Sequence, residues 1–320
     1  MDSGTRRDAL RAGALAATVA TAGVLLSRRG KRPDEHETAF TPKTRASIAA
    51  DPRYPDIAVV QGMQPDAIVR RAVEELGGMR RFVSPGDIVV VKPNAAWDRA
   101  PEQAANTNPE VIAAVVRLCL EAGARRVTVT DHCTNEARSV FERSRIAQAA
   151  RQAGAEVVLP EQRLFREVDL RGEVLRAWPV LLPFLTADKI INVPVAKHHS
   201  LTQVTLGMKN LYGILGGQRQ RLHQRIDECL ADLTAFLRPT LTIVDAFRVL
   251  MRNGPAGGSI SDVALRRTVI ASIDPVAADA YAARAFWNLE EQALSFLSLA
   301  ARRGLGVARL ETLRTSILRQ

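Results

Sequence analysis

Short apolar runs alternate along this chain with segments whose apolar positions recur at helical spacing. The runs predict strands at 57–60, 88–91, 127–130, 156–159, 190–195, 241–245 and 267–272. The helically spaced segments predict helices at 65–81, 109–123, 139–152, 222–237, 275–287 and 291–303. Because strands and helices alternate, we expect an α/β fold: a doubly wound, mostly parallel sheet with helices on both faces.

Local signals support two of these helix starts and one strand. Asn108-Pro109 and Asp274-Pro275 each place a side-chain oxygen before a proline, which is the usual arrangement of an N-cap and the first helical residue. The run Ile88–Val91 is apolar at consecutive positions, which is typical of a strand covered on both faces.

The first 52 residues differ in composition from the rest. Arg6-Arg7 stand ahead of an uncharged, Ala-rich run from 12 to 26, a pattern typical of a Tat export signal. That run falls short of the roughly 20 residues that span a bilayer, so a cleaved signal and an N-terminal membrane anchor both stay open. We therefore expect a Tat-type signal or anchor at 1–29, a polar, Pro-containing linker at 30–52 and a single α/β domain at 53–320. The predicted location is periplasmic, reached through the Tat export machinery.

Charge and cysteine usage exclude some functions. The formal net charge is +10, but the chain shows no basic stripe interleaved with aromatic residues, so we expect no nucleic acid partner. The three cysteines are far apart and contain no CxxC, so no cysteine-ligated iron-sulfur cluster is expected. The positive charge suits an acidic small molecule, and ordinary solubility would account for it equally well.

Lysine is rare here, because only six of the 44 basic residues are lysines. In such an Arg-rich chain, lysine is a candidate for chemistry that arginine cannot do, such as losing a proton or presenting a compact charge to an anion. Three lysines fall at predicted strand ends or in a Gly-punctuated loop: Lys92, Lys197 and Lys209. A coding bias toward arginine would also produce this pattern.

Polar side chains follow the predicted strands. They are Lys92 and Asn94, Asp131 and His132, then Lys197, His198 and His199, and further along Lys209, Asn210 and Asn253. If the strands are parallel, these groups emerge at one edge of the sheet, where open α/β sheets bind ligands. The sequence therefore predicts one cleft at the carboxyl ends of the strands.

The residue types suggest roles in that cleft. His132, His198 and Lys197 are the candidate catalytic residues, since imidazole and a buried amine can exchange protons. Lys92, Asn94, Lys209, Asn210 and Asn253 are candidate cofactor-binding residues. Asp131, His132, His198 and His199 could together bind a divalent metal. Solvated or core histidines without a ligand remain the alternative interpretation.

Several stretches between 57 and 287 resemble a known family. These stretches are VVVKPNAA, TNPEVIAAVVRLCLEAGARRVTVTD, INVPVAKHHSLTQVTLGMKNLYGILGG, LTIVDAF, NGPAGG and DPVAADAYAARAFW. They are similar to domain-of-unknown-function family 362, some of whose members carry Tat leaders and others ferredoxin modules. The family's activity is not established. This chain lacks the cysteine clusters of the members that look like iron-sulfur proteins.

A further likeness is to lactate racemase-type proteins, in which a lysine and histidines surround a nickel pincer nucleotide. Here a strand ending in Val193-Pro194 is followed by a histidine and a Gly-rich segment with a lysine. The resemblance implies that Lys209 corresponds to the cofactor-holding lysine and His198 to a catalytic histidine. The Ser-Gly-Gly that precedes the lysine in those proteins is absent from this chain.

We therefore expect an exported α/β protein that binds an anionic small molecule or cofactor at the carboxyl edge of its sheet, with metal assistance left open. The alternative is a non-catalytic cofactor-binding or assembly protein of the cell envelope. Titratable groups converging in a pocket would favour catalysis, whereas scattered groups and a large apolar surface patch would favour a partner-binding role.

Overall fold

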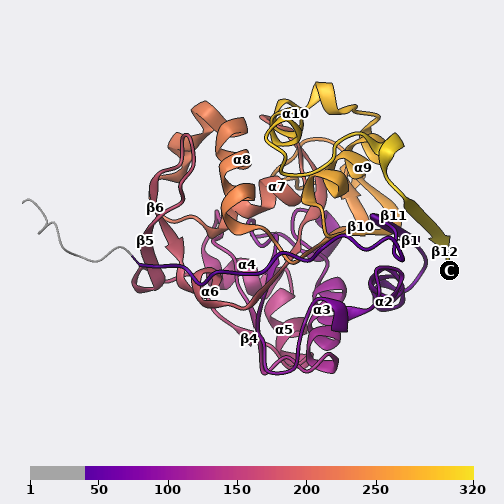
Figure 1. The fold of residues 1–320 in the computed structure, drawn as a ribbon, viewed down its shortest axis with the longest axis horizontal. Helices are drawn as coiled ribbons and strands as arrows, with labels where there is room; N and C mark the ends of the chain where they lie inside the picture. Colours follow the sequence, from indigo (N-terminus) through magenta and orange to yellow (C-terminus); the bar gives the residue numbers. More distant parts are fainter. Residues whose placement is uncertain (1–39) are drawn as a thin grey trace, which may run out of the picture. The chain divides into compact units, whose positions relative to one another are not determined.

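A central sheet organises residues 40–320, the part of the chain that this computed structural model describes (Figure 1). Its strands, in the order β12-β1-β11-β10-β7-β2-β3-β4, are β12 (Thr315–Arg319), β1 (Ile57–Gln61), β11 (Val263–Ser272), β10 (Leu241–Leu250), β7 (Lys189–Val193), β2 (Ile88–Pro93), β3 (Arg126–Val129) and β4 (Glu156–Val157). β8 (Val195–His199) continues beside β10, and β9 (Gln203–Thr205) pairs with β8. A separate hairpin consists of β5 (Phe165–Asp169) and β6 (Ala177–Leu181).

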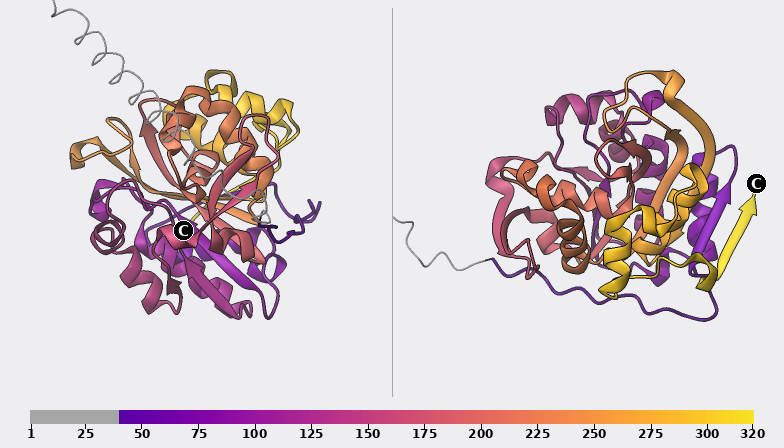
Figure 2. Two further views of the ribbon diagram at one scale, coloured as in Figure 1. Left: turned by 90° about the vertical axis from the view of Figure 1, so that its left-hand side faces the viewer. Right: turned by 90° about the horizontal axis from the view of Figure 1, so that it is seen from above.

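The central sheet is mostly parallel, as predicted. β10, β7, β2, β3 and β4 pair in parallel, whereas β11 runs antiparallel to both β1 and β10. The C-terminal strand β12 lies parallel to β1 at one edge of the sheet (Figure 2).

Helices surround this sheet. The α-helices are α2 (Pro65–Glu75), α3 (Pro109–Glu121), α4 (Ala137–Arg143), α5 (Ile146–Gln152), α6 (Leu182–Thr186), α7 (Gly207–Asn210), α8 (Ile226–Leu237), α9 (Pro275–Trp287) and α10 (Ser295–Arg302). Short 3-10 helices include η4 (Leu211–Ile214) and η5 (Arg219–Arg225). Alternate residues of β2 enter two separate hydrophobic clusters, Val90 one and Val89 and Val91 the other, so both faces of the sheet are buried. The doubly wound α/β class predicted from the sequence is confirmed.

The predicted N-caps are present. The Asn108 side chain accepts a hydrogen bond from the backbone N–H of Glu110 at 3.0 Å. The Asp274 carboxylate accepts from the N–H groups of Val276 and Ala277 at 2.8 and 3.0 Å. Each cap satisfies N–H groups that have no partner within the helix.

Two predicted elements are divided in the structure. The helix predicted at 139–152 forms α4 and α5, because Arg145 adopts a positive φ of 60° between them. The strand predicted at 190–195 ends as β7 at Val193, and β8 begins at Val195, after a proline that cannot donate to the sheet. Lys197, His198 and His199 therefore lie within β8 rather than after a strand.

The segment 40–52 differs from the predicted linker. It contains no helix or strand, but it is hydrogen-bonded to the body of the protein. The Lys43 N–H donates to Leu185 O, and the Arg45 guanidinium donates to the carbonyls of Phe184 and Leu237. Residues 40–52 thus belong to the same compact unit as the sheet. The predicted signal at 1–29 lies outside the described residues, and no helix within 40–320 is long and apolar enough to cross a bilayer.

The order of the strands creates a switch point beside β2. From β2 the chain moves outward to β3 and β4, and it then returns to form β7 on the other side of β2. β2 and β7 are in register there, with Lys92 opposite Asn192. In open α/β sheets the crevice for a ligand lies at such a point, outside the carboxyl ends of the strands.

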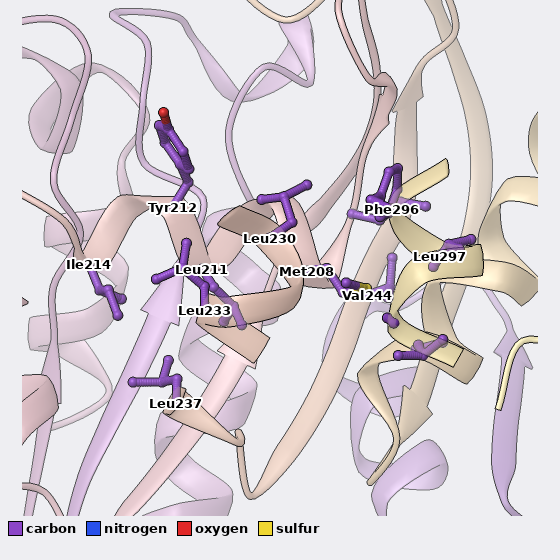
Figure 3. Packing of buried hydrophobic residues seen from close by; sticks show 14 of the residues in the cluster. Met208, Leu211, Tyr212, Ile214, Leu230, Leu233, Leu237, Val244, Phe296 and Leu297 are labelled. Carbon is purple, nitrogen blue, oxygen red and sulfur yellow. The ribbon is translucent and has the colours of Figure 1, made fainter. Parts of the chain in front are cut away.

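The segment α7–η4 passes over this switch point and is anchored by apolar packing. Met208, Leu211 and Ile214 are fully buried and belong to one hydrophobic cluster with Leu230 and Leu233 of α8 (Figure 3). In Figure 3 the hydroxyl of Tyr212 points away from this cluster. The core therefore holds α7–η4 in place while its polar side chains remain available on the other side.

Candidate functional site

A cavity of about 470 Å³ opens at the switch point. Its walls come from the residues that follow β2 and β3, from β8, from the stretch between β9 and η5 inclusive, and from Pro255 in the loop after β10. The polar and aromatic side chains that line it include Asn94, Trp97, Asp131, His132, Cys133, Lys197, Thr205, Lys209, Asn210, Tyr212, Arg219 and His223. This volume lies within the range of small-molecule and cofactor sites.

A buried ion pair forms the base of the cavity. Lys92 is fully buried, and its Nζ lies 2.7 Å from Asp131 Oδ1. The other oxygen, Asp131 Oδ2, accepts a hydrogen bond from the Ala95 N–H at 2.7 Å. Burial lowers the pKa of Lys92, and the Asp131 carboxylate opposes that shift. Asp131 is therefore occupied by protein groups on both oxygens.

Three asparagines connect this ion pair to β7 and β8. Asn210 Oδ1 accepts from Lys92 Nζ at 3.3 Å and from Asn94 Nδ2 at 3.0 Å. Asn210 Nδ2 donates to Asn192 Oδ1 at 2.8 Å. Asn94 Oδ1 in turn accepts from Lys197 Nζ at 3.0 Å. Residues from β2, β7, α7 and β8 thus share one hydrogen-bond network.

Lys197 is the second buried amine. Its side chain is only 1% exposed, and Nζ donates to Asn94 Oδ1 and to Ala105 O, the latter at 2.6 Å. Within residues 40–320 it forms no salt bridge. Burial, together with the neighbouring ammonium of Lys209, lowers the pKa of Lys197 to about 7.

Lys209 is the third buried amine at this site. It is 8% exposed, and its ammonium lies 4.2 Å from the centre of the Tyr212 ring. This contact stabilises the charged form of the amine. In the described part of the chain Lys209 has no carboxylate partner. Burial, with a contribution from Arg219, lowers the pKa of Lys209 to about 8.

Arg219 also lines the cavity, although the sequence analysis did not identify it. Its guanidinium donates to His132 O at 2.9 Å and to Cys133 O at 2.8 Å, which fixes the turn after β3 to η5. Tyr212 hydrogen-bonds to the Arg219 carbonyl, and its ring stacks on exposed His223. Arg219 lies in a Gln/Arg-rich run of an Arg-rich chain, so no local signal separates it from a surface arginine.

Of the candidate histidines, His132 lines the cavity. Its Nδ1 lies 2.5 Å from Leu215 O, so this nitrogen carries the proton and Nε2 is left as an acceptor. Burial, then the charge of Arg219, lowers the pKa of His132. The ring is therefore neutral near pH 7 and able to accept a proton.

His198 and His199 do not line the cavity. His198 Nδ1 accepts from the Gly254 N–H at 3.2 Å, and His199 Nδ1 accepts from the Leu201 N–H at 3.1 Å. Burial and the nearby Lys209 ammonium lower the pKa of His199 to about 3. Both rings therefore act as acceptors for loop backbone.

The structure does not assemble the predicted metal ligands. No group of three or more His, Cys, Asp or Glu side chains within 40–320 is arranged to hold a metal ion. The expected set was Asp131, His132, His198 and His199. The physical reason is that Asp131 is paired with Lys92, while the two β8 histidines accept hydrogen bonds from loop backbone and do not line the cavity.

Asn253, a predicted cofactor-binding residue, also lies outside the lining of the cavity. It is exposed in the loop after β10, where its amide donates to Asp262 Oδ2 at 2.9 Å, and it does not line the cavity. Of the other predicted cofactor-binding residues, Lys92, Asn94 and Asn210 lie in the hydrogen-bond network at or beneath the cavity, and Lys209 lines the cavity.

Two further residues position the site. Asp279 of α9 is fully buried, and its carboxylate accepts from the N–H groups of Gly207 and Met208 at 2.6 and 2.8 Å, which fixes the start of α7. Burial raises its pKa to about 7. Gly213 packs against the ion pair so closely that a Cβ there would collide with Asp131 and Lys92.

Comparisons with known proteins identify the family of this chain. A family model described as domain of unknown function (DUF362) matches residues 89–284, and the chain belongs to this family. The Thylakoid-associated protein sll1697 from Synechocystis sp. is 29% identical over 214 residues, which cover 62% of this chain and 64% of that protein. The chain thus spans less than two thirds of the length of this relative.

Among solved structures, the lactate racemase apoprotein from Thermoanaerobacterium thermosaccharolyticum is similar to this chain, with a TM-score of 0.37 and 12% identity. The similarity covers 66% of this chain and 55% of the racemase.

The buried ion pair generates a stability prediction. Replacing Asp131→Asn leaves the Lys92 ammonium buried without a counter-charge, so we expect the free energy of unfolding to fall by about 3–5 kcal/mol. Urea unfolding of the purified protein measures this change. The double variant Lys92→Met, Asp131→Asn removes both charges and should recover part of the loss. If the losses of the two single variants simply added, the proposed coupling between Lys92 and Asp131 would be wrong.

Proposed function

We propose that this protein binds a small anionic molecule or cofactor in the cavity at the carboxyl edge of its sheet. The observation that carries the proposal is that Lys197 and Lys209 are both almost fully buried at one cavity, without a carboxylate partner in the described residues. Isolated charges of this kind are costly to bury. A bound anion would offset that cost at Lys209, and at Lys197 in its protonated form.

The charges around the cavity support the same ligand class. Asp131 is the acidic side chain among the lining residues, and it is already neutralised by Lys92. Lys197, Lys209 and Arg219 therefore leave a net positive potential inside the site. Carboxylates and phosphates are the anions that ammonium groups bind through charge-assisted hydrogen bonds.

The convergence of titratable groups favours chemistry over passive binding. His132 and Lys197 line one cavity with pKa values lowered by burial, and groups of this kind can exchange protons near neutral pH.

A second candidate, a non-catalytic cofactor-binding or assembly role in the cell envelope, is favoured by the name of the Synechocystis relative, which associates that protein with thylakoids.

Export is part of the proposal and is supported by the twin arginines. Replacing Arg6 and Arg7 by lysine should abolish transport of the full-length chain, because the Tat route depends on this pair. Fractionation of a Tat-competent host measures the periplasmic share of the protein. Equal periplasmic amounts of the two forms would contradict Tat export.

Calorimetry tests anion binding directly. Inorganic phosphate, pyrophosphate and small mono- and dicarboxylates are titrated into the protein. Lys209→Met removes one charge-assisted contact, so affinity for the anion that binds should fall roughly 10- to 100-fold. Lys189→Met is the matched control, because Lys189 lies at the start of β7 and does not line the cavity. Equal losses in both variants, or no binding of any anion, would contradict the proposal.

The pH dependence has a defined sign. An anion binds the ammonium form, and the pKa values of Lys197 and Lys209 are lowered to about 7 and about 8. Binding should therefore draw protons from solution once the pH exceeds about 7, and affinity should fall as the pH rises through about 7 and then about 8. Titrations in two buffers with different ionisation enthalpies measure the protons taken up. Constant affinity without proton uptake from about pH 6 to about pH 9 would contradict the assignment.

A further inference from the structure

We infer that Lys197 is an amine nucleophile that forms an imine with the carbonyl carbon of a small oxo compound, whose carboxylate or phosphate is held by Lys209. This inference rests on the proposed anion-binding function and goes further, because it assigns different roles to the two cavity lysines and names a substrate class.

The hydrogen bonds of Lys197 favour its neutral form. Nζ has two acceptors among the described residues, Asn94 Oδ1 at 3.0 Å and Ala105 O at 2.6 Å. A neutral amine has two N–H donors and one lone pair, so these acceptors satisfy both donors and leave the lone pair free. An ammonium would carry a third N–H in a buried position. The lowered pKa of Lys197, about 7, agrees with this geometry.

The surroundings of the other site lysines favour their charged forms. Lys209 lies over the face of Tyr212, whose ring attracts a cation and offers no acceptor for a neutral amine. Lys92 is paired with Asp131 and does not line the cavity. Among the three, Lys197 is thus the amine with a free lone pair at the cavity wall, and Lys209 is the cation suited to an anionic group.

The step balances without a further reactant. The Nζ lone pair attacks the carbonyl carbon, and the π electrons of the C=O bond move to oxygen, giving a carbinolamine. The nitrogen loses its protons, the oxygen leaves as water, and a C=N bond forms in place of C=O. Neutral His132, with Nε2 unprotonated, lines the same cavity and can accept and return the transferred proton.

Reductive trapping tests the inference without knowledge of the natural reaction. The protein is incubated near neutral pH with sodium cyanoborohydride and one of three probes: pyruvate, glyceraldehyde 3-phosphate or uncharged glyceraldehyde. Reduction converts an imine to a stable secondary amine, which intact-mass and peptide analysis locate. We expect one adduct per chain on Lys197, forming at least about 10-fold faster with an anionic probe than with glyceraldehyde. The pyruvate and phosphate arms distinguish a carboxylate from a phosphate as the anionic group.

Variants separate the roles. Lys197→Arg should abolish the adduct, Lys209→Met should slow its formation with the anionic probe, and Lys189→Arg should react as the parent does. Because a buried variant can fail to fold, the parent protein is also trapped in excess inorganic phosphate, which should slow the reaction by competing for Lys209. An adduct on Lys209, or equal labelling of Lys189 and Lys197, would overturn the inference.

The outcomes also distinguish the two proposals. If calorimetry shows that anions bind and no Lys197 adduct forms with either anionic probe, the imine is excluded while the anion site stands. If neither binding nor trapping occurs, both proposals fail. A Lys197 adduct that forms equally fast with all three probes, and is unaffected by phosphate, would contradict the role assigned to Lys209.

Discussion

The buried pair between Lys92 and Asp131 is the interaction on which the rest of the site depends. One oxygen of Asp131 pairs with the ammonium of Lys92, and the other accepts a hydrogen bond from the Ala95 N–H. These contacts connect the end of β2 to the end of β3. Lys92 Nζ also donates to Pro93 O and to Asn210 Oδ1 in α7. A buried pair of this kind contributes little net stability, but its geometry is demanding. Here that geometry holds three elements around one cavity, and the lack of a side chain at Gly213 lets η4 approach.

Most of the fold follows from local pattern. The structure contains the buried strand predicted from the apolar run before Lys92. It also contains the two helices predicted to begin at Asn-Pro and Asp-Pro. The break at Arg145 and the restart of the strand after Val193 were not predicted, because apolar spacing does not register a single positive φ or a missing N–H. The segment 40–52 looked like a linker because polar composition does not reveal hydrogen bonds to distant carbonyls such as Leu237 O.

The site was predictable to the extent that strand ends mark it. Lys92 and Asp131 come together because the parallel strands β2 and β3 end at one edge of the sheet. Lys197 joins them from β8, which begins just beyond the end of β7. Two site residues that do not follow a strand could not be identified from the sequence pattern. Asp279 lies within a helix and acts on the start of α7 through backbone N–H groups, whereas Arg219 resembles the arginines around it. The four predicted metal ligands do not come together for a related reason. The residue types suit a metal, but they do not reveal that the Asp131 carboxylate is already paired with Lys92.

The choice of lysine over arginine is the remaining clue to chemistry. In the described residues Lys43 is a half-exposed partner of Asp188, whereas Lys92, Lys197 and Lys209 are buried around the cavity. An arginine at Lys197 would bring a permanently charged group with five donors to a position with two acceptors, leaving charge and donors uncompensated. A lysine can release its proton and leave a lone pair instead. Electrostatic attraction for an anion would be served by either residue, so the position of Lys197 argues for a group whose charge changes during function.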